Sequence, residues 1–278
     1  MTISLFICPL CYTTLYPAAA QWRCEQGHSF DVARPGYVNL LSVQHKNSRE
    51  PGDSKVMVEA RHRFLSSGIY APIAEALWQG LSRWLPTPTP VIVDAGCGEG
   101  YYLNALSGHL AAQEATLIGV DIAKPAIHKA AVTYKRIQWI VASNRHLPLQ
   151  PNSLDAILCL FGFACFDVFA HALKPGGVVL MIDPDKDHLL ELRQVVYPMI
   201  KEKTAPTPPP WAAAGLIQRD ETRLTYRPAT LDQQQLHNLI LMTPHVFRAP
   251  AEGKERLAQL PALDITVAVT LRVLQKAY

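Results

Sequence analysis

The sequence has few of the features that mark membrane, secreted or disulfide-rich proteins. No apolar run approaches the ~20 residues of a transmembrane helix, and the opening MTISLFICPL lacks the basic start and long apolar stretch of a secretory signal. Only 6 of the 278 residues are cysteine, too few for a disulfide scaffold. The formal net charge is only +3, so a polyanionic partner is permitted without being demanded. We expect a cytoplasmic globular protein that makes no membrane contact.

Differences in composition and periodicity divide the chain into three segments. Residues 1–40 lack helical periodicity and hold three of the cysteines, and residues 41–85 carry mixed charge followed by an amphipathic pattern over 73–85. The segment PTPTP then ends that helix. A chain of 278 residues has room for one full domain and a smaller module. We predict a small module over 1–40, a basic, helical connector over 41–85 and a larger domain over 86–278.

The larger domain alternates between apolar runs and helical patterns. Apolar runs occupy 91–96, 116–121, 137–142, 154–161 and 178–183, and helical patterns occupy 101–112, 124–135 and 165–173. Continuous apolar strands that alternate with helices predict a parallel sheet covered on both faces, and therefore an α/β fold. We further expect a polar helix near 187–203, a loop over 204–211 and a late strand over 264–274.

A cluster of metal-binding residue types lies in the first segment. Cys8 and Cys11 form one close pair, Cys24 and His28 form a second, and twelve residues separate the pairs. Zn²⁺ favours four tetrahedral nitrogen or sulfur ligands, so this set predicts a closed, structural zinc site. The alternatives are four unrelated residues or a redox Cys-x-x-Cys, but no βαβ pattern accompanies this one. We expect Cys24→Ser to unfold residues 1–40 and to spare the larger domain.

A glycine-rich turn follows the first strand of the larger domain. Asp94 precedes Gly96, Gly98 and Gly100, and this G-x-G-x-G spacing differs from the G-x-G-x-x-G of dinucleotide sites. S-Adenosylmethionine carries a sulfonium and an ammonium group and no pyrophosphate. A carboxylate at Asp94 suits that ammonium, so the turn favours S-adenosylmethionine.

A second carboxylate ends the next strand. Asp121 lies where a carboxylate accepts hydrogen bonds from ribose hydroxyls, and the carboxyl ends of neighbouring strands face one crevice. The alternative for Asp94 or Asp121 is that it caps the helix that follows its strand.

These motifs resemble those of the class I methyltransferases, which have a Rossmann-like fold. The first motif of that family is similar to residues 94–100 and the second to Asp121. Residues 143–149 resemble the segment that borders the adenine, and the resemblance implies that Ser143 faces this ring. The turn at residues 174–177 resembles the one before their fifth strand.

A narrower resemblance covers most of the chain. The cysteine cluster, FDVARPGYVNLL at 30–41 and QHKNSREPGD at 44–53 are similar to the RlmA family, which methylates N1 of a guanine in a hairpin loop of 23S rRNA. In that family the residues matching Tyr70, Gly98, Glu99 and His188 contact the methyl donor. The resemblance also implies a homodimer. From the residues alone, Tyr70 is equally a cap on an apolar helix, and His188 a solvated residue.

The acceptor side departs from that family. RlmA-like sequences have a proline-containing segment after the fourth strand, whereas this chain has FGFACF at 161–166. Cys165 has apolar neighbours, which favour packing over nucleophilic catalysis. Asp183, at the end of the fifth strand, is either a general base or a helix cap, so we name no catalytic base.

Basic residues between Gln44 and Arg63 suggest contact with RNA. We define the basic strip as the five cations of this stretch, which are Lys46, Arg49, Lys55, Arg61 and Arg63. A strip of this kind binds a phosphate backbone, or it is an ordinary solvated face.

The resemblance to the RlmA family implies a 23S rRNA (guanine-N1)-methyltransferase. The alternatives are a methyltransferase of another RNA or a small molecule, and a catalytically silent RNA-binding relative.

Overall fold

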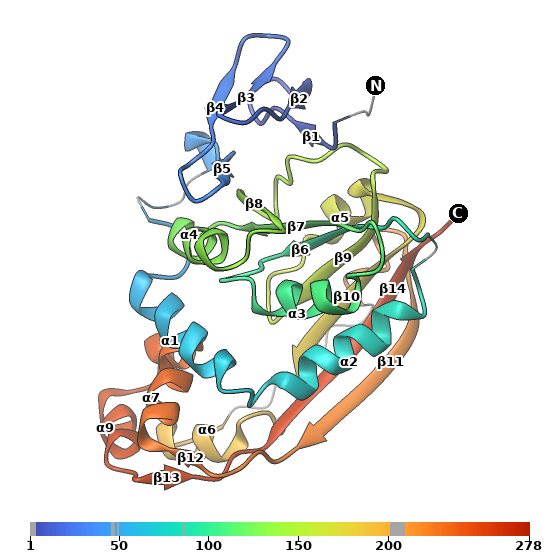
Figure 1. Ribbon diagram of the computed structural model, residues 1–278. Helices are drawn as coiled ribbons and strands as arrows, with labels where there is room; N and C mark the ends of the chain where they lie inside the picture. Colours follow the sequence, from blue (N-terminus) through green and yellow to red (C-terminus); the bar gives the residue numbers. More distant parts are fainter. Residues whose placement is uncertain (1–3, 46–47, 49, 86, 201–208) are drawn as a thin grey trace.

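The computed structural model describes residues 4–45, 48, 50–85, 87–200 and 209–278. Its centre is an eight-stranded sheet with the order β11-β14-β10-β9-β6-β7-β8-β5 (Figure 1). The strands are β5 (Tyr37–Asn39), β6 (Val91–Ala95), β7 (Thr116–Asp121), β8 (Gln138–Val141), β9 (Leu154–Leu160), β10 (Leu173–Pro184), β11 (Leu216–Tyr226) and β14 (Val267–Lys276).

The six strands from β10 to β5 pair in parallel, and β14 and β11 complete the sheet as antiparallel strands. The order reverses beside β6, whose neighbours are β7 and β9. A reversal of this kind opens a crevice at the carboxyl ends of the strands, where ligands of open α/β sheets bind. The predicted α/β class and the five predicted strands from β6 to β10 are confirmed.

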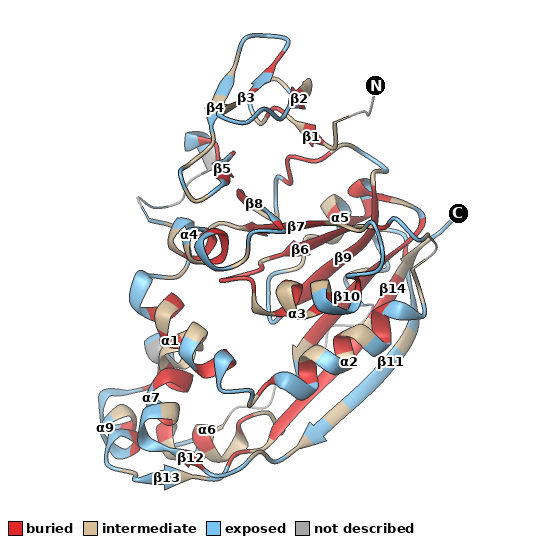
Figure 2. Ribbon diagram, in the orientation of Figure 1, coloured by how far each residue is buried: buried red, intermediate tan, exposed pale blue. Residues whose placement is uncertain are grey.

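Side chains alternate along the strands and supply two cores. One face carries Ile92, Leu158 and Leu180 and is covered by α2 (Ala71–Ser82), α3 (Tyr101–His109) and α4 (Lys124–Thr133). The other face carries Val93 and Ile157 and is covered by α5 (Phe166–Ala172) and by apolar residues of the N-terminal segment. Figure 2 shows these strands as an almost continuous buried layer.

A small four-stranded sheet lies beside the β8–β5 edge of the central one (Figure 1). It consists of β1 (Phe6–Ile7), β2 (Thr14–Tyr16), β3 (Gln21–Cys24) and β4 (Ser29–Asp31), all antiparallel. We call residues 4–33 the ribbon. The predicted boundary at residue 40 differs from the structure, because Tyr37–Asn39 pair with β8 as the edge strand β5 of the large sheet.

The predicted connector over 41–85 is an integral part of the fold. It contains the short 3-10 helix η1 (Val43–His45), then α1 (Lys55–Ser66) and α2. Phe64 of α1 and Leu77 of α2 are fully buried in the same core as the central sheet. The segment therefore does not link two separate bodies.

The remaining elements form a cap beside α1. They are α6 (Leu190–Val196), α7 (Gln233–Met242), α8 (His245–Arg248), α9 (Ala251–Ala258) and the short strands β12 (Leu231–Asp232) and β13 (Ala262–Leu263). The predicted polar helix corresponds to α6, which ends earlier than expected, and most of the predicted loop over 204–211 lies outside the described residues. Within the described part of the chain, no helix has the length and apolar character needed to cross a membrane.

Candidate functional site

The ribbon brings its four predicted metal ligands together. The Sγ atoms of Cys8, Cys11 and Cys24 and a ring nitrogen of His28 all lie within 4.8 Å of one another. His28 Nδ1 lies 3.6 Å from Cys8 Sγ and 3.5 Å from Cys24 Sγ, and the Sγ atoms of Cys11 and Cys24 are 3.6 Å apart. Tetrahedral zinc with bonds of about 2.0–2.3 Å separates its ligand atoms by about 3.4–3.8 Å. The four residues therefore fit Zn²⁺ as a closed set with no position left for water.

The backbone around the metal ligands makes two tight turns. Tyr12 and Gly27 adopt positive φ values of 60° and 83°, and the N–H groups of Tyr12 and Gly27 donate to the carbonyls of Cys8 and Cys24. Glycine tolerates such a conformation without a steric penalty, and Tyr12 adopts it at a cost. The hydroxyl of Thr13 lies 3.1 Å from Cys11 Sγ, and this hydrogen bond lowers the pKa of Cys11 to about 7.

A second group of predicted residues meets at the carboxyl ends of β6 and β7. Gly96, Gly98 and Gly100 all have positive φ, which lets the chain turn sharply between β6 and α3. Asp121 Oδ2 accepts a hydrogen bond from the N–H of Gly98 at 2.9 Å, and its Oδ1 accepts one from Ala123 at 2.7 Å. The Asp121 carboxylate therefore ties the glycine-rich turn to the start of α4. We call this region the donor crevice.

Two carboxyl groups of the donor crevice are buried without full satisfaction. Asp94 is 1% exposed and Glu99 is 2% exposed, and Asp94 Oδ1 and Glu99 Oε1 have no hydrogen-bond partner among the described residues. Burial, together with the charges of Asp121 and Glu99, raises the pKa of Asp94 to about 8. Burial also raises the pKa of Glu99 to about 7, although the charge of Arg61 opposes this shift. Buried carboxylates without partners fit a cationic ligand that donates hydrogen bonds, as S-adenosylmethionine does.

Arg61 lies in the donor crevice, although the sequence placed it in the basic strip. Its guanidinium pairs with Asp53 at 2.5 Å and donates to the carbonyl of Met242 at 3.2 Å. A Cβ added to Gly98 would lie 3.4 Å from Arg61 Nη1, so the two residues are in contact. Burial alone would lower the pKa of Arg61, but the carboxylates of Asp53 and Glu99 raise it. Arg61 is thus a partly buried cation of the donor crevice.

Besides Arg61, the described cations of the basic strip are Lys55 and Arg63, which both lie on α1. Lys46 and Arg49 lie outside the described residues. Arg63 pairs with Glu59, and Lys55 and Arg63 border an open hollow of about 290 Å³ between α1 and α7. Contact of the strip with RNA remains a prediction.

Tyr70 and His188 contact each other across 118 positions of sequence. The Tyr70 hydroxyl lies 3.3 Å from His188 Nε2, and the N–H of Ala268 donates to His188 Nδ1 at 3.3 Å. This acceptor role places the proton of a neutral His188 on Nε2. Burial, then the charges of His245 and Arg193, lowers the pKa of His188 to about 4. His188 is therefore a neutral, partly buried ring with a contact at each nitrogen.

The segment after β8 reaches the same edge of the sheet. Ser143 Oγ accepts a hydrogen bond from the N–H of Arg145 at 3.2 Å. Asn144 donates through Nδ2 to the carbonyls of Ala95 at 3.1 Å and Phe163 at 3.2 Å. Asn144 was not among the predicted site residues, although its place beside Ser143 after a buried strand is the signal that could have identified it.

Aromatic side chains gather where β9 ends. Phe161 has a positive φ of 53°, and its ring stacks on Tyr70 at 6.2 Å between centroids and lies 5.9 Å from His188. Phe163 is 65% exposed, and the Arg145 guanidinium lies 5.1 Å from the centre of its ring. We call Phe161, Phe163 and Arg145 the aromatic rim.

The two acceptor-side candidates from the sequence have other partners. Cys165 packs against the core on the ribbon side of the sheet, and burial raises its pKa, which favours a packing role for the thiol. Asp183 pairs with Arg272 at 3.3 Å, and although this charge lowers the pKa of Asp183, burial raises it overall. Asp183 precedes no helix directly, so the capping role is wrong.

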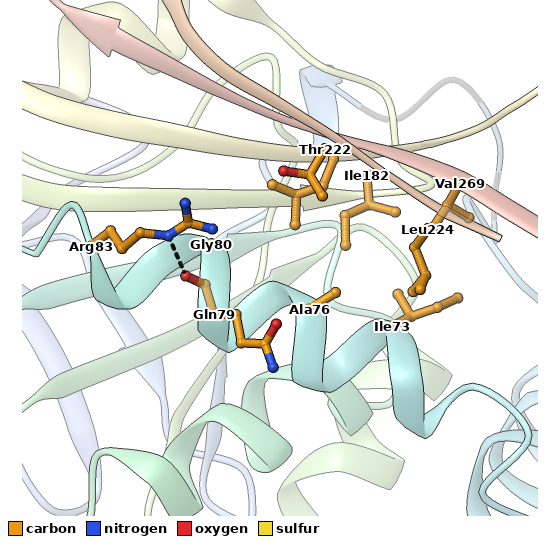
Figure 3. A pocket seen from close by; sticks show the side chains of 10 residues that line it. Ile73, Ala76, Gln79, Gly80, Arg83, Ile182, Thr222, Leu224 and Val269 are labelled. Carbon is orange, nitrogen blue, oxygen red and sulfur yellow. Dashed lines mark hydrogen bonds between the residues drawn. The ribbon is translucent and has the colours of Figure 1, made fainter. Parts of the chain in front are cut away.

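An apolar cavity lies away from these groups. It measures about 40 Å³, lies between α2 and the strands β10, β11 and β14, and is walled by Ile73, Ile182 and Val269 (Figure 3). Arg83 closes one end and donates through Nε to the carbonyl of Gln79 at 3.0 Å. A space of this size holds at most a few water molecules, so it is not the donor crevice.

Comparison with known proteins connects the ribbon and the crevice. Residues 6–49 match the family model described as RlmA, N-terminal, and residues 92–177 match the methyltransferase domain. The chain is 33% identical over 279 residues to the 23S rRNA (guanine(748)-N(1))-methyltransferase of Streptomyces fradiae, covering 96% of this chain and 95% of that relative. It is also 33% identical over 282 residues to YxjB of Bacillus subtilis, provisionally named a 23S rRNA (guanine-N(1)-)-methyltransferase, covering 97% and 96% of the two chains.

A solved structure supports the same fold. The YcgJ protein of Bacillus subtilis superposes with a TM-score of 0.52 at 16% identity, over 73% of this chain and 99% of that one. Together with the match of residues 92–177 to the methyltransferase domain, the likeness shows a class I methyltransferase fold for the central sheet and its helices. With the near full-length identity to the curated relatives, it follows that the chain belongs to the RlmA family of S-adenosylmethionine-dependent methyltransferases, which carry an N-terminal zinc ribbon.

Proposed function

We propose that this protein transfers the methyl group of S-adenosylmethionine to N1 of a guanine in a hairpin loop of 23S rRNA. The observation that carries the proposal is the attachment of an RlmA-type ribbon to the edge of the sheet that holds the donor crevice. The N–H of Ile7 donates to the carbonyl of Pro148 at 3.1 Å, and that of Gln150 donates to Leu5 at 2.8 Å. The relatives that share both parts carry names that specify this reaction.

We assign the donor-binding roles as follows. Asp94 binds the ammonium group of the donor. Asp121 accepts hydrogen bonds from the ribose hydroxyls through the lone pairs that its own backbone hydrogen bonds leave free. Glu99, Tyr70 and His188 line the methionine side, and Ser143 faces the adenine. Gly96 and Gly98 let the backbone approach the donor closely because a side chain is absent.

The residues of the crevice would position the reactants for in-line attack. S-Adenosylmethionine supplies an electrophilic methyl group when it is bound. Alignment of guanine N1 with that methyl group supplies much of the rate increase, because positioning removes an entropic barrier. The N1 proton leaves to solvent, because neutral His188 is held by Tyr70 and Ala268, and Asp183 is held by Arg272.

The target base must leave its stack to reach a buried donor. Enzymes that modify a base in a folded nucleic acid extrude it into the active site. RNA recognition of this kind uses splayed loop bases, which a hairpin provides.

We also propose that the protein acts in the cytoplasm and that it forms a homodimer. Sedimentation analysis of the purified protein would test the homodimer.

Reverse transcription of cellular 23S rRNA tests the substrate. Methylation of guanine N1 blocks the Watson–Crick edge, so the transcriptase stops one nucleotide before the modified base. We expect a stop that disappears when this gene is deleted, returns with the wild-type gene and does not return with Asp94→Asn. The same stop in all strains would refute the proposed substrate.

A further inference from the structure

We propose that the aromatic rim, formed by Phe161, Phe163 and Arg145, is the platform that receives the extruded guanine. The inference rests on the proposed function and adds to it the residues that hold the acceptor. It concerns the segment FGFACF at 161–166, which follows β9.

Phe161 lies at the border of the donor crevice. This residue directly follows the last residue of β9, and its N–H donates to the carbonyl of Ile182 at 2.8 Å. Its ring lies against Tyr70 and His188, beside the donor crevice. A phenylalanine with a φ of 53° is strained, and such strain persists where the surrounding structure holds it, often at a functional site. The backbone strain therefore directs an aromatic ring to the border between donor and acceptor.

The rings of Phe161 and Phe163 are both exposed to solvent. Phe161 is 39% exposed and Phe163 is 65% exposed. Neighbouring apolar side chains exposed at the mouth of a polar crevice indicate a surface that binds a partner. The Phe163 backbone is tied to the sheet, because Asn144 donates to both its carbonyl and that of Ala95. The exposed ring is thus carried on an anchored segment.

Arg145 lies over the ring of Phe163. Its guanidinium lies 5.1 Å from the Phe163 ring centre, within cation–π range, and the residue is otherwise exposed. An aromatic face beside an arginine is the combination that binds single-stranded nucleic acid: bases stack on the ring and the cation contacts base or phosphate. Stacking contacts the face of a guanine and leaves its Watson–Crick edge free. N1 lies on that edge, so the platform would present the reacting atom to the donor.

Variants of Phe163 test the platform. The assay is single-turnover methylation of a 23S rRNA transcript containing the target hairpin, with S-adenosylmethionine affinity measured separately by calorimetry. We expect Phe163→Ala to lower kcat/KM for the RNA by about 5- to 150-fold, the loss of one stacking contact, with the donor affinity unchanged within twofold. Phe163→Trp should restore activity, because any flat aromatic ring can stack.

Two further variants separate the contributions. Phe161→Asn removes the ring and tolerates positive φ, so it should weaken RNA methylation without unfolding the protein. Arg145→Ala should reduce the slope of log affinity for RNA against log salt concentration by about 0.7–0.9, the loss of one phosphate contact. Phe247→Ala on α8, 75% exposed, is the matched aromatic control and should leave all three measurements unchanged.

The outcomes distinguish a failure of the platform from a failure of the proposed function. If the wild-type protein labels the RNA and Phe163→Ala does so equally well, the platform is refuted and the proposed function stands. An equal loss of donor affinity in Phe163→Ala would also refute it, because the ring would then serve the donor site. If the wild-type protein binds S-adenosylmethionine and labels no RNA, the proposed function fails and the platform fails with it.

Discussion

Single residues in the donor crevice have ionisation states that differ from those in water. Asp94 and Glu99 each keep one buried carboxylate oxygen without a partner, and burial raises both pKa values. In the absence of donor, a raised carboxyl pKa makes the folded state bind more protons than the unfolded chain. Stability from these groups is therefore present at low pH and is lost as the pH rises from about 4 towards 8.

The binding of a cationic donor should reverse this dependence. Between pH 6 and pH 7.5 the donor ammonium stays largely protonated while the pKa of Asp94, about 8, keeps much of the carboxyl group neutral. Donor binding must then release a proton, so affinity should rise by up to about tenfold per pH unit. Calorimetry over this range measures the slope. Asp94→Asn should weaken binding and lower the slope, and an identical slope in both proteins would contradict the assigned role.

His188 should destabilise the protein in acid. Its folded pKa is about 4, below the ordinary value of 6.5, so stability present above pH 6.5 is lost as the pH falls through 4. The shift corresponds to about 3 kcal/mol of unfolding free energy between pH 7 and pH 4. Urea unfolding of the wild-type and His188→Gln proteins at both pH values measures it as a difference. A pH dependence equal in the two proteins would show that the ring is not buried as a neutral group.

At the scale of elements, the predictable part of the fold is the part with a strong sequence pattern. The strands β6 to β10 are continuous apolar runs, because helices or the ribbon cover both faces of the sheet. The edge strand β11 was not predicted, because most of its side chains are exposed and its pattern is polar. The strand β5 was also missed, since three residues carry too little periodicity.

The site divides in the same way. The zinc ligands and the glycine-rich turn could be predicted, because close spacing fixes their geometry locally. The place of Arg61 in the donor crevice was not predicted, since its contact with Met242 depends on the packing of α1 against α7. The backbone strain at Phe161 has no signal in composition or periodicity at all.

The packing of β7 against β8 gives a prediction for one element pair. A Cβ added to Gly119 would clash with the Trp139 ring and lie 3.1 Å from Cys97 Sγ. We expect Gly119→Ala to lower the free energy of unfolding by about 1–3 kcal/mol, the usual cost of overpacking a core.

Denaturant unfolding measures this cost against a matched control. Gly108 lies in the last turn of α3, and a Cβ there would meet nothing within 4 Å. Gly108→Ala should therefore stabilise the protein by about 0.5–1 kcal/mol through helix propensity. A Gly119→Ala protein as stable as the wild type would mean that Trp139 can move aside freely.

At the scale of the whole molecule, the ribbon completes the fold. Phe6, Leu15 and Trp22 share one buried cluster with Ile140 and Leu149 of the larger domain. The ribbon therefore covers part of a sheet face and does not hang from the domain as a separate finger. This arrangement differs from the expectation that residues 1–40 unfold alone.

Removal of zinc should consequently reach the larger domain. We expect chelation, or Cys24→Ser, to speed backbone hydrogen exchange both in residues 4–33 and in residues 142–150. The reason is that Ile7 donates a backbone hydrogen bond to Pro148 and Gln150 donates one to Leu5 across this contact. The helix α7 serves as the internal control and should exchange at its original rate. Faster exchange confined to residues 4–33 would indicate an independent module.

The central claim is that this chain joins a methyl-donor crevice to an RNA-directed ribbon in one enzyme. The most direct test is incubation of the purified protein with 23S rRNA from cells that lack it and with S-adenosylmethionine labelled in the methyl group, followed by nucleoside analysis. We predict that the label appears in 1-methylguanosine, at about one methyl group per 23S rRNA molecule, and is absent with Asp94→Asn. Label in another nucleoside, or none with a protein that binds the donor, would contradict the account.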